Sequence, residues 1–338
     1  MTHKDYVLAA INHEQTDRVP YSLGFDDNTD KELDTYCGST EWRKKLQRFL
    51  CHVGSVDANA EQQIDAAHRR DIFGTVWRVD RRPWHLEKPA MAQPRMDAIT
   101  WPTADQFPKT VVDNVAQLTG PNAEQFSIMD NGWGLFEHSW RLRGFENTLM
   151  DCIAEPDFYA ALLDKLTELR LGMVAKCADV AADAIMFGDD WGEQRGVIIG
   201  PDRWRKLLKP RWAKVFAATH AQKKYAICHS CGSVAAIIPD LIEIGLDVLE
   251  SVQPEAADMD PFVLKKKFGA KIVFWGCLGS QSTVPFATPK EIRKRVKDLC
   301  KVMGKGGGYI LAPAKGIQPG TPPENAAAVV EAFATQNL

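Results

Sequence analysis

The feature that most constrains the fold is a regular alternation of short apolar segments and longer helical segments in the second half of the chain. Short, nearly all-apolar strands separated by helices belong to a parallel sheet that is buried on both faces. Five consecutive strand-helix units favour an α/β fold of the (β/α)8 TIM-barrel type over an open doubly wound sheet. The predicted strands are 183–188, 225–228, 247–252, 271–275 and 309–313, and the predicted helices are 201–220, 233–244, 261–268, 288–303 and one that starts near 321.

The first half of the chain has a less regular pattern. A helix is predicted from Thr29 or Asp30 as far as Leu50, after a first strand at 19–25. Prolines interrupt the region from about 58 to 107, which predicts an insertion or cap on a single domain of residues 1–338. Further elements are predicted at 4–13 (helix), 126–130 (strand), 132–143 (Trp-rich helix) and 156–180 (long helix).

Local signals mark several boundaries in this pattern. Thr288-Pro-Lys-Glu291 has the pattern of an N-cap with a capping glutamate, and Thr321-Pro-Pro-Glu324 repeats it. The glycine-rich stretch 304–308 precedes a strand and opens no helix, so it is predicted to be a turn and not a phosphate-binding loop.

Composition narrows the class of protein. The chain of 338 residues is 45% hydrophobic and 25% charged, with a net charge of −3, which argues against nucleic acid as the main partner. No apolar run is long enough for a signal peptide or a membrane span. Eight scattered cysteines do not form a disulfide framework, so we expect a cytoplasmic protein. The oligomeric state stays open, with a homodimer as one option.

Polar side chains follow the predicted strands, at the rim where barrel enzymes place their sites. They are Asp189, Asp190, Trp191, Glu193 and Gln194 after the first strand of the series, His229 and Cys231 after the second, Glu250 and Gln253 after the third, Trp275, Cys277 and Gln281 after the fourth, and Lys315 after the fifth.

His229-Ser-Cys231 carries two metal ligands two residues apart. Alternate side chains of an extended chain share a face, and imidazole with thiolate suits Zn2+ best among common ions. Cys277 could supply a third ligand and leave an open position, which Asp190, Glu193 or Glu250 could fill at rest. The alternative is a hydrogen-bonded histidine beside small buried thiols.

The remaining polar and aromatic residues suggest catalytic and substrate-binding roles. Asp190 or Glu193 could donate a proton to a leaving group, and Lys315 could stabilise developing negative charge; the alternative is a solvated acidic turn and a solvated lysine. Tryptophans also build walls for flat ligands, although each alone could belong to the core. The candidate substrate-binding residues are Asp26, Trp133, Asp189, Trp191, Gln194, Trp275 and Gln281.

Several of these stretches resemble the uroporphyrinogen decarboxylase-like superfamily. They are Ala10-Ile-Asn-His-Glu14 with Asp17-Arg-Val-Pro20, Gly188-Asp-Asp-Trp-Gly-Glu-Gln194, His229-Ser-Cys-Gly-Ser233, Phe274-Trp-Gly276 and Gly308-Tyr-Ile-Leu-Ala-Pro313. The resemblance implies a TIM barrel. Its members are decarboxylases or corrinoid-dependent methyltransferases.

The departures from the family patterns favour one branch. Decarboxylases carry an arginine-rich early segment, where this chain has Ser22-Leu-Gly-Phe-Asp-Asp-Asn28 without arginine. The methylcobamide:coenzyme M methyltransferases use a later cysteine as a zinc ligand, where this chain has Lys315. The resemblance therefore implies the methyltransferase component of an O-demethylase. Such an enzyme moves a methyl group from a methoxylated aromatic compound to the cobalt of a partner corrinoid (cobalamin) protein, with Zn2+ assisting. The alternatives are methyl transfer to a thiol and porphyrinogen decarboxylation.

Overall fold

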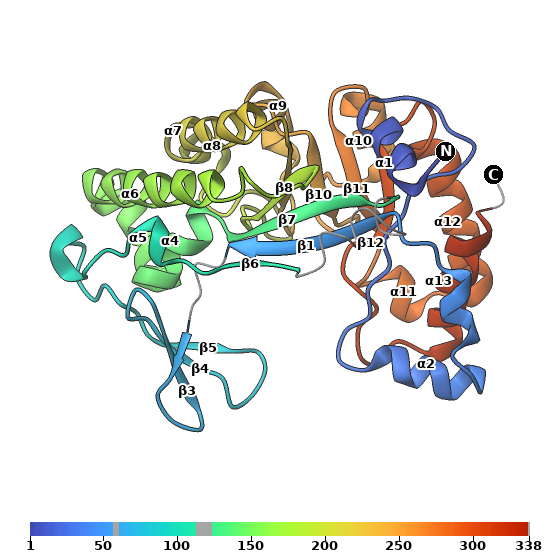
Figure 1. The fold of residues 1–338 in the computed structure, drawn as a ribbon, viewed down its shortest axis with the longest axis horizontal. Helices are drawn as coiled ribbons and strands as arrows, with labels where there is room; N and C mark the ends of the chain where they lie inside the picture. Colours follow the sequence, from blue (N-terminus) through green and yellow to red (C-terminus); the bar gives the residue numbers. More distant parts are fainter. Residues whose placement is uncertain (57–60, 113–123, 337–338) are drawn as a thin grey trace.

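The computed structural model describes residues 1–56, 61–112 and 124–336. One eight-stranded sheet forms the centre of the molecule (Figure 1). Its strands are β1 (Leu50–Val56), β6 (Lys109–Val111), β7 (Phe126–Trp133), β8 (Ala184–Gly188), β9 (Tyr225–His229), β10 (Val248–Val252), β11 (Val273–Leu278) and β12 (Tyr309–Pro313).

The strand order is that of a (β/α)8 barrel, as the alternation predicts. The order β12-β11-β10-β9-β8-β7-β1 follows the chain, and every pair in it is parallel. The predicted first strand contributes two parallel bridges, Tyr21 to Leu311 of β12 and Phe25 to Ile317 beyond the end of β12. Eight parallel segments therefore follow one another around the barrel, and their carboxyl ends share one rim.

One junction of the barrel has no strand pairing within the described part of the chain. It lies between residues 21–25 and β1, and we call it the seam. The far half of β1 pairs instead with the antiparallel strand β6, with Gly54 opposite Val111 and Val56 opposite Lys109. The near half of β1 pairs with no described strand on that side, and a cavity lies there.

Helices surround the sheet, with α6 and α8 packed together on one side and α12 and α13 on another (Figure 1). The helices are α1 (His3–Ile11), α2 (Thr29–Cys37), α4 (Leu135–Arg143), α5 (Phe145–Ala154), α6 (Pro156–Ala175), α7 (Pro201–Leu207), α8 (Lys209–Ala221), α9 (Ile238–Glu243), α10 (Pro261–Phe268), α11 (Thr283–Phe286), α12 (Pro289–Met303) and α13 (Pro323–Thr335), with short 3-10 turns η1 (Glu41–Lys45), η2 (Met96–Ala98), η3 (Ala104–Gln106) and η4 (Ala235–Ile237). Within the described residues, no helix combines the length and hydrophobicity that a membrane crossing needs.

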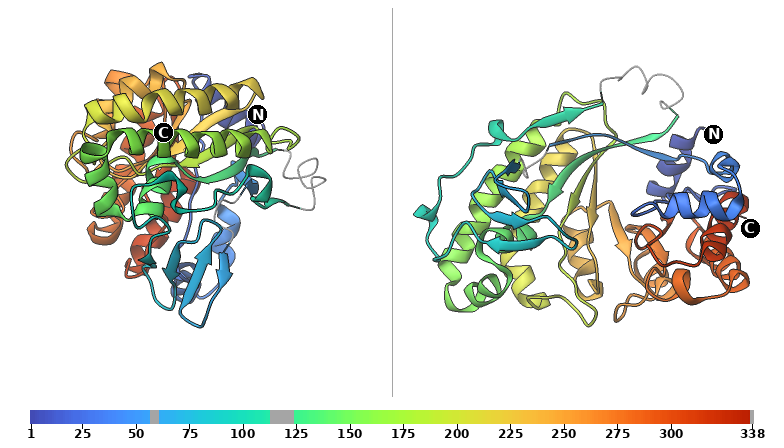
Figure 2. Two further views of the ribbon diagram at one scale, coloured as in Figure 1. Left: turned by 90° about the vertical axis from the view of Figure 1, so that its left-hand side faces the viewer. Right: turned by 90° about the horizontal axis from the view of Figure 1, so that it is seen from below.

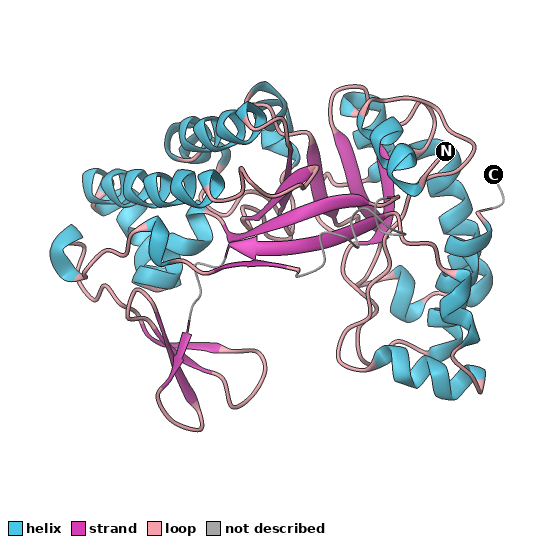
Figure 3. Cartoon of the chain, in the orientation of Figure 1, coloured by secondary structure: helices cyan, strands magenta, loops and turns pink. Residues whose placement is uncertain are grey.

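A second, antiparallel sheet lies in the region predicted as an insertion. Its order is β2-β3-β4-β5, and it projects away from the barrel strands (Figures 2 and 3). The strands are β2 (Glu61–Gln63), β3 (His68–Asp71), β4 (Val76–Arg78) and β5 (His85–Lys88). Asp71 ties this sheet together, because its buried carboxylate accepts hydrogen bonds from the backbone N–H groups of Phe73 and Thr75 and from Trp77 Nε1.

Two local predictions need correction. The predicted helix from Thr29 to Leu50 ends at Cys37, because Gly38 takes the left-handed conformation of a helix C-cap. The chain then makes a 3-10 turn and enters β1, which the sequence pattern did not reveal. The last helix begins after Pro322 and has no side-chain cap from Thr321. The Thr288–Glu291 capping box and the glycine turn before β12 are confirmed.

Candidate metal centre

His229, Cys231 and Asp190 meet at the carboxyl end of the barrel. His229 Nε2 lies 3.3 Å from Cys231 Sγ and 3.5 Å from Asp190 Oδ1. Within the described residues, this is the group of histidine, cysteine and acidic side chains whose potential ligand atoms all lie within 4.8 Å of one another. All three residues are partly exposed, so an ion could reach them.

Backbone contacts hold the two loops that carry these ligands. The N–H of Cys231 donates to Asp190 Oδ1 (2.8 Å), and the N–H of Asp189 donates to the carbonyl of His229 (2.9 Å). Gly192 and Gly232 allow the loops to touch, since a Cβ on Gly192 would lie 2.7 Å from the carbonyl oxygen of Cys231. Glycine at positions 192 and 232 therefore allows the two loops to approach this closely.

Glu250 orients the histidine from the neighbouring strand. In the parallel pairing of β9 and β10 it lies opposite His229, and its carboxylate is hydrogen-bonded to His229 Nδ1. A carboxylate on Nδ1 fixes the tautomer that leaves Nε2 free to bind a metal. Many zinc-binding histidines have a carboxylate in this position.

Replacing Glu250 by alanine should weaken metal binding without removing it. Loss of a carboxylate that orients a ligating histidine typically costs about 10- to 100-fold in affinity. Zn2+ titration against a competing chelator would measure this. Glu243→Ala is the matched control, because Glu243 is an exposed glutamate of α9 that pairs with Lys209. Equal affinity in Glu250→Ala and wild type would contradict the assigned role.

The donor set fits a zinc ion. Zn2+ binds histidine nitrogen at about 2.0 Å, thiolate sulfur at about 2.3 Å and carboxylate oxygen at about 2.0–2.2 Å in tetrahedral geometry. Such bond lengths place neighbouring ligand atoms roughly 3.3–3.6 Å apart, and the separations of 3.3 and 3.5 Å match this. Three protein ligands would leave a fourth position for substrate or water.

The group opens onto a cavity of about 450 Å³ inside the barrel mouth. This size suits a small organic molecule. Trp133 and the exposed Lys315 both line it, which places these two predicted site residues beside the metal group. The full lining is Asp130, Gly132, Trp133, Glu137, Met186, Phe187, Gly188, Asp190, His229 and Lys315.

Glu137 is a cavity residue that the sequence reasoning missed. It lies in the first turn of α4, just after β7, and is only 5% exposed. Burial raises the pKa of its carboxyl group to about 9, and the charges of Asp190 and Asp189 act in the same direction. Its position just after the end of β7 is the signal that could have found it.

Cys277 does not join the metal group, which corrects the prediction that its thiolate is the third ligand. Its thiol is fully buried, and burial raises its pKa well above the usual range. The physical reason is local backbone geometry: Gly276 and Cys277 have φ of +123° and +74°, and the pairing of β10 with β11 shifts register at this level. The thiol consequently lies beside Tyr309, and Asp190 provides the third potential ligand atom of the group.

Asp189 and Trp191 are buried beside the site and do not contact the cavity. The Asp189 carboxylate is fully buried and accepts hydrogen bonds from the N–H groups of Phe136 and Glu137 and from the indoles of Trp191 and Trp212. Trp191 is 1% exposed and packs against other tryptophan rings. Neither side chain lines the cavity.

The other predicted site residues lie at the rim or within the barrel. Glu193 faces Arg195 at 3.6 Å and does not line the cavity. Gln194 and Gln281 contact each other through their side chains, with 3.3 Å between Nε2 and Oε1. Asp26 accepts a hydrogen bond from Gln318, and the indole of Trp275 donates to Ser22 Oγ (2.9 Å).

Curated relatives match the chain over part of its length. The methylcobamide:CoM methyltransferase MtaA of Methanosarcina barkeri is 31% identical over 180 residues, which are 53% of this chain and 50% of the relative. Uroporphyrinogen decarboxylase of Coxiella burnetii is 26% identical over 185 residues, 53% of this chain and 47% of the relative. The chain thus spans about half the length of the curated relatives it matches.

A solved structure and a family model match more of the chain. A methyltransferase from Methanosarcina mazei superposes with a TM-score of 0.65 over 98% of both chains at 19% identity, which shows a shared fold. The model of the uroporphyrinogen decarboxylase (URO-D) family matches residues 135–336, more than half of the chain, including every ligand of the candidate metal centre. The chain therefore belongs to the uroporphyrinogen decarboxylase family.

Proposed function

We propose that this chain is a corrinoid-dependent methyltransferase that removes the methyl group of a methoxylated aromatic compound. The observation that carries the proposal is the Asp190–His229–Cys231 group, open to a cavity that Trp133 and Lys315 also line. The similarity of the chain to MtaA of M. barkeri supports methyl transfer, within a family that also contains decarboxylases. The acceptor would be the cobalt of a corrinoid held by a partner protein.

The residues of the cavity suit a methyl aryl ether. Trp133 offers a flat wall, and the guanidinium of Arg141 lies 4.4 Å from its ring centroid, which holds the indole in place. Met186 and Phe187 add apolar surface that excludes water. His229, Cys231 and Asp190 would hold Zn2+, which when bound acts as a Lewis acid toward an ether oxygen.

Methyl transfer would break the bond between the methyl carbon and the ether oxygen as that carbon bonds to the Co(I) acceptor, which supplies both electrons of the new bond. Both electrons of the broken bond remain on the oxygen, which leaves as a phenolate. Lys315 is the cation of the cavity best suited to stabilise this charge, and the carboxyl group of Glu137 can donate a hydrogen bond to the same space. Glu250 keeps His229 oriented throughout.

The second candidate is methyl transfer from a methylated corrinoid to a thiol. It is favoured by the 31% identity to MtaA, a methylcobamide:CoM methyltransferase. Lys315 stands where the resemblance places a ligating cysteine, and Asp190 occupies the third ligand position. These two departures favour the ether as substrate.

The test is a matched pair of assays with a corrinoid protein. In the first, the Co(I) protein is incubated with vanillate; in the second, the methylated protein is incubated with coenzyme M. We expect methylcobalamin absorbance to appear in the first assay. Lys315→Ala should slow its appearance. Lys305→Ala, which removes an exposed lysine that does not line the cavity, should not slow it. Activity only in the second assay would move the assignment to thiol methylation. Release of CO2 from uroporphyrinogen would indicate a decarboxylase and would contradict both methyl-transfer assignments.

A further inference from the structure

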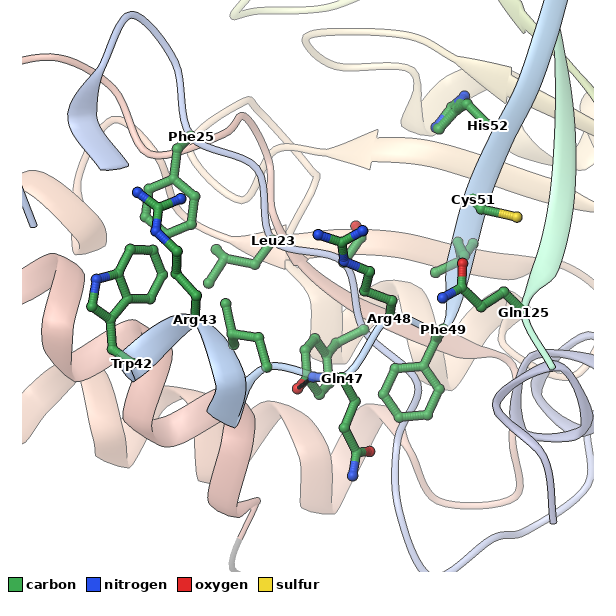
Figure 4. Close-up of a pocket in the computed structure, with 14 residues that line it drawn as sticks. Leu23, Phe25, Trp42, Arg43, Gln47, Arg48, Phe49, Cys51, His52 and Gln125 are labelled. Atoms are coloured by element: carbon green, nitrogen blue, oxygen red, sulfur yellow. Dashed lines mark hydrogen bonds between the residues drawn. The ribbon is translucent and has the colours of Figure 1, made fainter. Parts of the chain in front are cut away.

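A second cavity, of about 520 Å³, lies at the seam of the barrel (Figure 4). Residues 21–25 form one wall, and the turn before β1 with the start of β1 forms the other. Trp42 and Phe25 lie at one end of the view, and Cys51 and His52 lie at the other, with Arg48 between them. The volume is in the usual range for small-molecule sites.

The charge of this cavity contrasts with that of the candidate metal centre. Among the described residues, its lining contains two arginines and one histidine but no aspartate or glutamate, although the chain as a whole has a net charge of −3. Arg43 is already neutralised, because its guanidinium pairs with Asp30 and Asp34 at 2.9 and 2.7 Å. Arg48 is exposed and has no ion pair or hydrogen bond with any other described residue.

Other hydrogen-bond donors face the same space. Backbone N–H groups alternate in direction along a strand, and Ser22 directs its N–H to Leu311 of β12. The N–H groups of Tyr21 and Leu23 therefore point to the seam, where no described residue accepts from them. These two N–H groups can therefore donate hydrogen bonds to an acceptor in the cavity.

His52 adds a further donor. Its Nδ1 lies 2.8 Å from Oδ2 of Asp130, which lines the cavity beside the metal group. This hydrogen bond raises the pKa of His52, and the imidazole Nε2 has no partner among the described residues. The apolar part of the lining comes from Phe25, Leu46 and Phe49.

We propose that the seam cavity is a binding site for a small aromatic carboxylate, with Arg48 as its principal anchor. A guanidinium matches the planar geometry of a carboxylate and binds it in bidentate fashion. The apolar walls suit the ring of such a ligand. The site is separate from the metal group and does not depend on the proposed methyl transfer.

Benzoate and benzamide are matched probes, because they have nearly the same shape and differ in charge. Titration calorimetry should show that benzoate binds the wild-type protein at least ~10-fold more tightly than benzamide. Arg48→Ala should weaken benzoate binding by at least ~10-fold, because it removes the guanidinium that would form charge-assisted hydrogen bonds with the carboxylate. Arg81→Ala removes an exposed arginine that does not line the cavity and should leave the affinity unchanged.

His229→Ala provides the arm that separates this site from the metal centre. Benzoate affinity should be the same in His229→Ala and wild type, whatever the outcome of the methyl-transfer assays. Equal binding of benzoate and benzamide, or full benzoate affinity in Arg48→Ala, would overturn the proposal. A loss of benzoate binding in His229→Ala with no loss in Arg48→Ala would place benzoate in the cavity beside the metal group. That result would overturn the proposal as well.

Discussion

His229→Ala and Cys231→Ser should each purify as folded protein with little bound metal and with methyl transfer reduced on the order of 100- to 1,000-fold. Each substitution removes one of the three proposed ligands, and Lewis-acid assistance would contribute several kcal/mol to such a reaction. Both side chains are partly exposed at a strand end, so their loss should leave the barrel core intact. Elemental analysis, circular dichroism and the vanillate assay together measure the effect.

The chain offers matched controls for both residue types. Cys37→Ser removes an exposed cysteine of α2, and His85→Ala removes an exposed histidine of β5. Both should keep wild-type metal content and activity. If His229→Ala and Cys231→Ser instead retain stoichiometric metal, the ligands have been assigned wrongly. If they lose metal but keep full activity, the metal has no catalytic part.

Asp189→Ala should cause the largest loss of stability among single substitutions near the site, about 4 kcal/mol or more in the free energy of unfolding. The fully buried carboxylate accepts four hydrogen bonds, and each buried donor left without a partner costs about 1–3 kcal/mol. Two of those donors are backbone N–H groups in the first turn of α4, so the start of this helix should loosen too. Urea unfolding followed by tryptophan fluorescence would measure the change.

Asp202→Ala is the control, because Asp202 is a nearly fully exposed aspartate that pairs with Arg205 on the same helix. It should change the free energy of unfolding by less than about 1 kcal/mol. A comparably small change in Asp189→Ala would show that the buried carboxylate does not hold β8 against α4. The same result would reopen a substrate-binding role for Asp189.

The periodicity of the sequence predicted the barrel because each strand-helix unit is a local signal. Apolar runs of strand length and strong caps such as Thr288 depend on residues that are close in the chain. The pairing of His229 with Cys231 was predictable for the same reason, since two residues two apart on an extended segment share a face. The strand β1 was missed because its start follows a polar, helix-like stretch that Gly38 interrupts.

The third ligand could not be predicted from the pattern, because side-chain direction at a strand end depends on the backbone there. Positive φ angles at Gly276 and Cys277 turn that thiol away from the rim. Asp189 and Asp190 are adjacent and chemically identical, yet one is fully buried against two indoles and the other lines the cavity. Only the three-dimensional packing of Trp191 and Trp212 separates their roles.

The most direct test of the central claim is X-ray absorption spectroscopy at the zinc edge on the purified wild-type protein. The account predicts a four-coordinate zinc with one sulfur at about 2.3 Å and the remaining ligands nitrogen or oxygen at about 2.0–2.2 Å. That set corresponds to Cys231, His229, Asp190 and one exchangeable ligand. A spectrum with two sulfur ligands, or a protein that binds no zinc, would contradict it.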